Sequence, residues 1–276
     1  MLTTLGDLVS PVMLAVFVAV ASWWLGTGAI LWLVRRPVHL FRLSMGGLTL
    51  LLLLSLVGTS WSMRQLSAAA DYVGFISVIA MWSWHEMAFL SGWVTGPRRV
   101  AQEPHVSGWR RFSLAVQALL YHELALLLNF VVLCLLQRQQ PNHVALCTFA
   151  LLWCMRLSAK LNLYCGVPQV GEQYLPSHLQ YMASYFRKSS VTGCFYLTMT
   201  LSTGTWLWLV LQAQRGAIEV STGWVLLASL LGLAIIEHVL MLFALPLQRL
   251  WGWAMRQRSV SAPVPAPGLS APVDQA

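Results

Sequence analysis

Three histidine–glutamate pairs lie inside long apolar stretches of this chain. Two have the same order, His85-Glu86 and His122-Glu123, and the third is Glu237-His238. Ionisable side chains at membrane depth are costly to bury, so they generally mark functional sites. An imidazole can bind a metal or act as the axial ligand of a haem or chlorin. A carboxylate can bind a metal, transfer a proton or neutralise a buried cation.

Two basic residues, Arg156 and Lys160, lie in a further apolar stretch. They are four residues apart, which places them on one face of a helix. Two roles fit them. They can neutralise the three glutamates, or they can bind the carboxylate or phosphate of a ligand.

The spacing of these residues restricts the chemistry. Adjacent residues on a helix point about 100° apart, so we do not expect His85 and Glu86, or His122 and Glu123, to bind one metal together. The sequence contains neither the Glu-x-x-His pattern of di-iron bundles nor the HExxH zinc motif. Three interpretations stay open: a buried polar network that fixes helix packing, a site for a ligand or pigment, and a metal-dependent catalytic site.

The composition indicates which elements position these residues. Of 276 residues, 58% are apolar and only 9% are charged, whereas soluble domains carry about 25% charged residues. Apolar stretches of about 20 residues, long enough to cross a bilayer, recur along the chain. The prediction is an all-α, polytopic transmembrane bundle that forms one domain, residues 1–258. The net charge of +8 comes largely from loop arginines, so no nucleic-acid partner is expected.

About seven membrane-spanning helices are expected, together with one short interfacial helix at about 176–188 and a disordered tail at 259–276, rich in Pro, Ala and Ser. The predicted spans are about 11–34, 44–61, 71–93, 112–136, 143–163, 191–213 and 222–246. In the interfacial helix, Leu179, Met182 and Phe186 would share one face, with His178, Tyr181 and Tyr185 on another.

The basic residues predict the orientation of the chain in its membrane. One side of the seven-span arrangement carries twelve lysines and arginines, and the other side carries only Arg64, Arg138 and Arg215. The positive-inside rule then places the N-terminus outside and the C-terminus in the cytoplasm. With this topology His85, His122, Arg156 and Glu237 all lie about 10–15 Å below the cytoplasmic interface, at 1.5 Å per residue. Four helices would thus bring ionisable groups to one level.

Several segments resemble those of a known family. They are Trp23–Trp32 (WWLGTGAILW), Trp82–Met87 (WSWHEM), Thr95–Arg99 (TGPRR), Gly108–Phe112 (GWRRF), Tyr121–Leu124 (YHEL), Met155–Asn162 (MRLSAKLN), Gly166–Pro168 (GVP), Leu175–Pro176 (LP), Ser184–Arg187 (SYFR) and Glu237-His238. In combination they resemble the PuhE family of photosynthetic complex assembly proteins in purple and related phototrophic bacteria. The resemblance implies a role in building the reaction centre or its antenna, or in adjusting bacteriochlorophyll supply. It also implies a bacterial inner membrane, cytoplasmic or intracytoplasmic, so that the N-terminus expected outside would be periplasmic. It implies no known reaction, and no catalytic residue can be transferred.

Three functions remain as hypotheses. The first, which we favour, is a non-enzymatic assembly factor that contacts reaction-centre or light-harvesting subunits and handles bacteriochlorophyll or haem through the intramembrane His/Glu pairs. The second is a membrane-embedded, metal-dependent enzyme acting on a chlorophyll precursor or a quinone. The third is a transporter, although no inverted repeat with broken helices is evident. The sequence does not identify a bound cofactor or metal.

Overall fold

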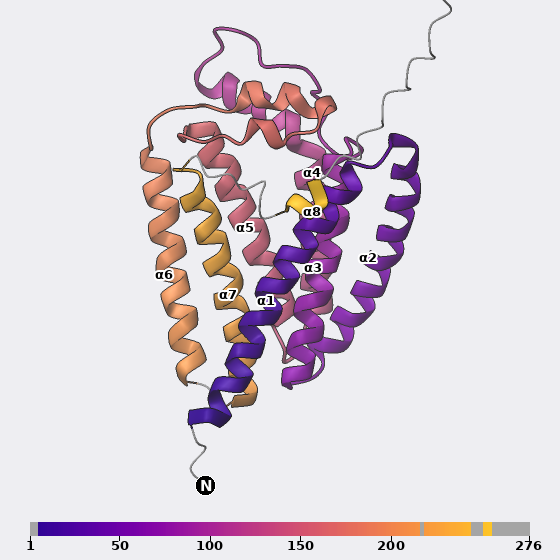
Figure 1. Cartoon of the computed structure of the whole chain (residues 1–276), viewed down its shortest axis with the longest axis vertical. Helices are drawn as coiled ribbons and strands as arrows, with labels where there is room; N and C mark the ends of the chain where they lie inside the picture. Colours follow the sequence, from indigo (N-terminus) through magenta and orange to yellow (C-terminus); the bar gives the residue numbers. More distant parts are fainter. Residues whose placement is uncertain (1–4, 216–217, 244–250, 256–276) are drawn as a thin grey trace, which may run out of the picture.

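The computed structural model describes residues 5–215, 218–243 and 251–255 and shows a bundle of long helices (Figure 1). Seven helices in this part of the chain are long and apolar enough to cross a membrane. They are α1 (Leu5–Val34), α2 (Phe41–Met63), α3 (Ala68–Leu90), α4 (Gly108–Leu136), α5 (Val144–Cys165), α6 (Gly193–Arg215) and α7 (Ile218–Leu240). The predicted all-α bundle with seven spans is confirmed.

Short elements complete the described part of the chain. They are the 3-10 helices η1 (Val38–Leu40), η2 (Glu172–Tyr174) and η3 (Ser177–Tyr185), and the short helix α8 (Gly252–Met255). Most predicted helix bounds differ from the structure by a few residues, and the first helix begins at Leu5 instead of residue 11. Helix α3 ends at Leu90 instead of residue 93, because the chain turns at Gly92, whose φ of +79° favours glycine. Helix α7 ends at Leu240 instead of residue 246, and the tail at 259–276 lies outside the described residues.

The short helix predicted at about 176–188 is present but shorter, and its predicted faces were wrong. It is a 3-10 helix of nine residues, Ser177–Tyr185. Its buried residues are Leu179, Met182 and Tyr185, three apart, as expected for a helix with three residues per turn. The prediction assumed 3.6 residues per turn and therefore placed Phe186 on the apolar face and Tyr185 on the opposite face.

Helix α3 lies at the centre of the bundle and contacts α1, α2, α4, α5 and α7. It and α7 are the most enclosed of the seven spans. A core of apolar side chains from α2, α3, α4 and α5 packs around Trp82, Leu126 and Phe149. Helix α6 lies at one side of the bundle against α7 and α5 (Figure 1). The central position of α3 brings its His85 and Glu86 within reach of the surrounding helices.

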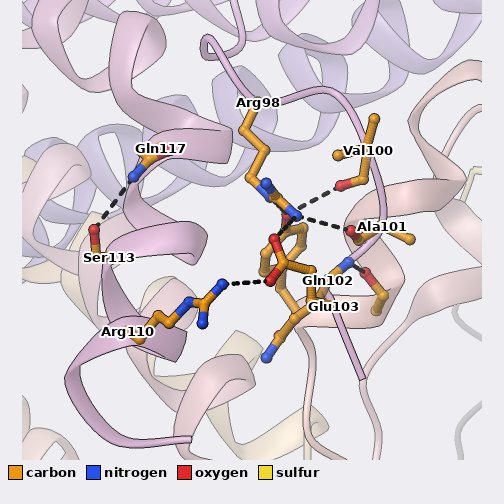
Figure 2. Close-up of polar contacts among 10 residues, drawn as sticks. Arg98, Val100, Ala101, Gln102, Glu103, Arg110, Ser113 and Gln117 are labelled. Atoms are coloured by element: carbon orange, nitrogen blue, oxygen red, sulfur yellow. Dashed lines mark hydrogen bonds and ion pairs between the residues drawn. The ribbon is translucent and has the colours of Figure 1, made fainter. Parts of the chain in front are cut away.

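Two long connections gather over one end of the bundle, α3–α4 and α5–α6 (Figure 1). Polar contacts hold them together (Figure 2). Arg98 donates from Nε to the Tyr185 hydroxyl at 2.9 Å and forms an ion pair with Glu103 at 3.2 Å. Glu103 also pairs with Arg110 at 2.8 Å, and the Gln102 amide donates to Ser184 Oγ at 2.8 Å. These contacts attach the α3–α4 connection to η3. The two connections, residues 91–107 and 166–192, together form the cap of the bundle.

The turn at Thr95-Gly96 packs directly against the backbone of α4. The His122 amide donates to the Thr95 carbonyl oxygen at 2.9 Å, so this turn supplies a hydrogen-bond acceptor to a transmembrane helix. A Cβ atom on Gly96 would lie 2.0 Å from the Gln117 carbonyl oxygen and 2.6 Å from the Ala118 carbonyl carbon. Only glycine permits this approach without moving the backbone.

We therefore expect Gly96→Ala to destabilise the protein by about 1–3 kcal/mol, the usual cost of overpacking, and to lower its Tm by several degrees. The measurement is thermal unfolding of the protein purified in mild detergent. Gly46→Ala is the matched control. A Cβ at Gly46, in α2, meets nothing within 4 Å, so its Tm is expected to stay equal or rise slightly. An unchanged Tm for Gly96→Ala would contradict the close approach.

The predicted orientation can be tested with reporters fused to the C-terminus of the full chain. We expect a C-terminal green fluorescent protein to fluoresce, and a C-terminal alkaline phosphatase to be inactive, because the basic connections are retained in the cytoplasm. Active phosphatase at the C-terminus would reverse the predicted topology.

Candidate functional site

Helix α5 carries three polar side chains that reach three neighbouring helices. Arg156 Nη2 lies 3.0 Å from Glu86 Oε1 on α3. The Lys160 ammonium forms an ion pair with Glu123 on α4. Ser158 Oγ lies 2.9 Å from His238 Nε2 on α7. Through these contacts α5 connects α3, α4 and α7 at one level of the bundle.

Each of the three glutamates also accepts a hydrogen bond from a tryptophan indole. The pairs are Trp82 Nε1 with Glu86 Oε1 at 2.9 Å, Trp153 Nε1 with Glu123 Oε2 at 3.0 Å, and Trp23 Nε1 with Glu237 Oε1 at 2.7 Å. Sequence reasoning missed these donors. The four-residue spacing of Trp82 and Glu86 was a usable signal, whereas the other two pairs join different helices and have none.

Two of the three histidines serve helix packing. His238 Nδ1 donates to the Ala234 carbonyl oxygen at 2.8 Å, which leaves Nε2 to accept from the Ser158 hydroxyl. His85 Nε2 lies 2.8 Å from the Asn129 amide nitrogen, and its ring is buried beside Trp84 and Phe149. In both rings Nε2 is engaged. Nδ1 of His85 has no hydrogen-bond partner among the described residues, but neither ring lines the two cavities described below. Asn129 is a further partner that sequence reasoning missed.

His122 has a different environment. Its ring centroid lies 4.6 Å from that of Phe89, and its buried Nδ1 has no hydrogen-bond partner among the described residues. The imidazole lines a cavity of about 650 Å³, within the roughly 300–1,000 Å³ typical of small-molecule sites. Of the three histidines, His122 is therefore the one that faces a space large enough for a ligand.

The cavity of about 650 Å³ combines charged and apolar walls. Its charged and polar residues include Glu86, Arg156 and Lys160 together with His122. Its apolar residues include Leu31, Phe41, Phe89, Leu119, Leu163, Pro176 and Met182. Residues of the cap form one wall, and Arg35 and Arg36, from the α1–α2 connection, lie at its edge. Such a wall suits an amphipathic molecule with an anionic group.

A smaller cavity of about 180 Å³ adjoins it between α1, α3, α5 and α7. Glu86 and Arg156 line both cavities, and Glu237 and Trp23 line only the smaller one. The Arg156 side chain is 47% exposed although its helix crosses the bundle, because much of its surface faces these hollows. The Glu86–Arg156 ion pair thus lies in the wall between two cavities.

The predicted site residues therefore divide into two groups. Around the two cavities the structure brings together Glu86, His122, Arg156, Lys160 and Glu237, with Glu123 held beside Lys160. His85 and His238 line neither of these cavities.

Adjacent histidine and glutamate residues reach different partners. His85 contacts Asn129 on α4, whereas Glu86 contacts Arg156 on α5. Within the described residues, no group of three or more His, Cys, Asp or Glu side chains could hold a metal ion. The metal-dependent catalytic interpretation therefore has no ligand set in this part of the chain.

Another buried carboxylate, Asp71 at the start of α3, was not among the predicted site residues. It accepts from the Asn142 amide at 2.7 Å. Asn142 also caps the start of α5, where its Oδ1 accepts from the Val144 amide at 3.0 Å. The pair ties α3 to α5 at the end of the bundle opposite the cap and has no direct contact with the cavities.

Comparisons with known proteins found a family model and a relative that each match most of this chain. The family model described as "Protein of unknown function (DUF3623)" matches residues 8–262. The "Uncharacterized 30.4 kDa protein in puhA 5'region" of Rhodobacter capsulatus is 38% identical over 257 residues, which cover 88% of this chain and 92% of that protein. No solved structure matches this chain.

The Lys160–Glu123 pair offers a test of the network. We expect Lys160→Met and Glu123→Gln each to lower Tm in detergent, because each leaves a largely buried charge without its partner. The double variant should recover part of the loss, with a coupling energy of about 1–3 kcal/mol. The matched control is the exposed pair Arg110–Glu103, for which Arg110→Met and Glu103→Gln should show a smaller coupling. Equal coupling in the two cycles would refute a special role for the α5 pair.

Proposed function

The chain belongs to the DUF3623 family, and from this premise we propose that it is an integral membrane assembly factor for the bacterial photosynthetic reaction centre or light-harvesting complex. Its relative in Rhodobacter capsulatus is named for the 5′ region of puhA, which supports a role related to photosynthesis. Seven helices that are long and apolar enough to cross a membrane support a role within the bilayer. The PuhE resemblance is the finer family assignment that we propose.

The observation that carries the proposal is the cavity of about 650 Å³ with His122 in its wall. Its apolar side chains can enclose a large flat hydrophobic molecule, and its basic side chains can receive an acidic group on that molecule. These features fit a bacteriochlorophyll-type chlorin or a haem. When bound, such a group would supply a metal centre, and His122 would hold it through an imidazole nitrogen.

The chain's own residues have separate tasks in this proposal. His122 provides the imidazole, and Phe89 keeps its ring in position through their contact at 4.6 Å. Lys160 and Arg156 orient the ligand through its anionic substituents. Glu123 and Glu86 neutralise the two cations before a ligand enters and so keep the charged cavity wall stable.

The proposed partners are reaction-centre or light-harvesting subunits in the bacterial inner membrane. The cap joins one wall of the cavity to the exposed surface at that end of the bundle, where Arg36 lies with its guanidinium 3.8 Å from the centroid of the Trp32 ring. A pigment held in the cavity would therefore be close to the surface at which a nascent subunit docks.

The test is an absorption spectrum of the protein purified in mild detergent from a phototrophic host, with metal analysis of the same sample. We expect a Soret or near-infrared band that is lost in His122→Leu, because the substitution removes the axial nitrogen. The control is His143→Leu, an exposed residue just before α5 at the other end of the bundle, which should retain the band.

Two outcomes would overturn this proposal. A colourless protein with near-stoichiometric iron or zinc would favour the alternative, a membrane-embedded enzyme acting on a chlorophyll precursor or quinone. A colourless, metal-free protein that leaves complex assembly unaffected when His122 is replaced would leave the buried polar network as the role of these residues.

A further inference from the structure

A third cavity, of about 320 Å³, lies under the cap, between the turn after α3 and the 3-10 helix η3. Its polar lining consists of Ser91, Thr95, Arg99, His178 and Tyr181. Only Phe41 and His178 also line the cavity of about 650 Å³. The space is therefore distinct from the cavity assigned above to a pigment.

Two residues that line this cavity, Thr95 and Tyr181, carry buried hydroxyl groups that lie next to each other and pair by a hydrogen bond. Neither hydroxyl has a further hydrogen-bond partner among the described residues. Burial raises the pKa of the Tyr181 phenol, so the group keeps its proton at neutral pH. In such a pair one hydroxyl donates to the other, and the second O–H is left without an acceptor. A buried O–H without an acceptor is unfavourable, which indicates that an acceptor belongs beside the pair.

The charge around the cavity is positive. Arg99 lines it, close enough to Tyr181 to oppose the effect of burial on the pKa of that phenol. Arg99 has no ion-pair partner in the described part of the chain, whereas its neighbour Arg98 is paired with Glu103. No Asp or Glu residue lines this cavity. The lining thus offers a cation and an O–H donor without a competing anion.

The donors are held in place by contacts outside the cavity. The Thr95 carbonyl oxygen accepts from the His122 amide at 2.9 Å. His178 Nε2 donates to the Leu90 carbonyl oxygen at 2.8 Å, which attaches the first turn of η3 to the end of α3. A ligand would therefore find these groups already positioned, which lowers the entropy lost on binding.

We propose that this cavity binds an oxyanion, a phosphate or carboxylate group, with Arg99 as its counter-charge and the free O–H of the Thr95–Tyr181 hydroxyl pair as its hydrogen-bond donor. A charge-assisted contact from arginine together with neutral hydroxyl donors is a common way to hold such groups. The cavity lies at the level of the connections over the bundle. A phospholipid head group and a free phosphate share this chemistry.

The test uses the full-length protein in mild detergent and inorganic phosphate as the probe. Binding is measured as the rise in Tm with phosphate against chloride at equal ionic strength. We expect the wild-type Tm to rise, and Thr95→Val and Arg99→Gln each to weaken phosphate binding at least tenfold. Tyr181→Phe, which removes only the hydroxyl, should weaken binding in the same direction.

Matched controls separate binding from folding. Thr59→Val alters another completely buried threonine, in α2, and its hydroxyl has no partner among the described residues. Arg138→Gln removes an exposed arginine at the opposite end of the bundle. Both controls should bind phosphate like the wild type. The Tm of each variant without phosphate shows whether it is folded.

A second measurement distinguishes the two sources of the anion. Native mass spectrometry of the same samples counts phospholipids that remain bound after detergent release. About one retained phospholipid in the wild type, lost in Arg99→Gln and Thr95→Val, would identify a head group even when free phosphate has no effect. If neither phosphate binding nor lipid retention differs between these variants and the controls, the proposal is refuted. That result leaves the His122 cavity unaffected.

Discussion

Two cations on α5 require anions from other helices, because a charged side chain within a membrane has little water to solvate it. Arg156 meets Glu86 on α3, and Lys160 meets Glu123 on α4. These pairs restrict how α5 can rotate and slide against both neighbours. Indole donors from Trp82 and Trp153 occupy further acceptor positions on the two glutamates. Much of the arrangement around the cavities follows from this single requirement for charge neutralisation.

The ion pairs of α5 line cavities and are not enclosed in a packed core. If the pairs served only packing, apolar residues of equal volume could replace them, often with no loss of stability. Arg156 nevertheless presents about half of its side-chain surface to the space around it, and Glu86 and Arg156 line two adjoining cavities. Ion pairs at a cavity wall can exchange one partner for a ligand group, which a sealed pair in the core cannot do.

The sequence was sufficient to predict the helices, because apolar stretches of about 20 residues have few alternatives in a membrane. It also gives one predicted depth for His85, His122, Arg156 and Glu237, since a predicted depth depends only on residue count. It could not predict rotation about each helix axis. His85 and His122 have similar sequence neighbours, yet one contacts Asn129 and the other faces a cavity. The error at η3 has the same origin, because the choice between 3.0 and 3.6 residues per turn decided which tyrosine is buried.

Thr95 joins the two proposed sites through its backbone and its side chain. Its carbonyl oxygen accepts from the amide of His122, and its hydroxyl belongs to the cavity lined by Arg99. Gly96 lets the same turn pack closely against the α4 backbone. The turn therefore cannot move without disturbing the helix segment that carries His122. An anion that holds Thr95 in place would therefore also hold the His122 backbone, and linkage requires a ligand at His122 to affect anion binding by the same factor. The position of the cap is thus coupled to the position of His122 in the intramembrane site that the cap covers.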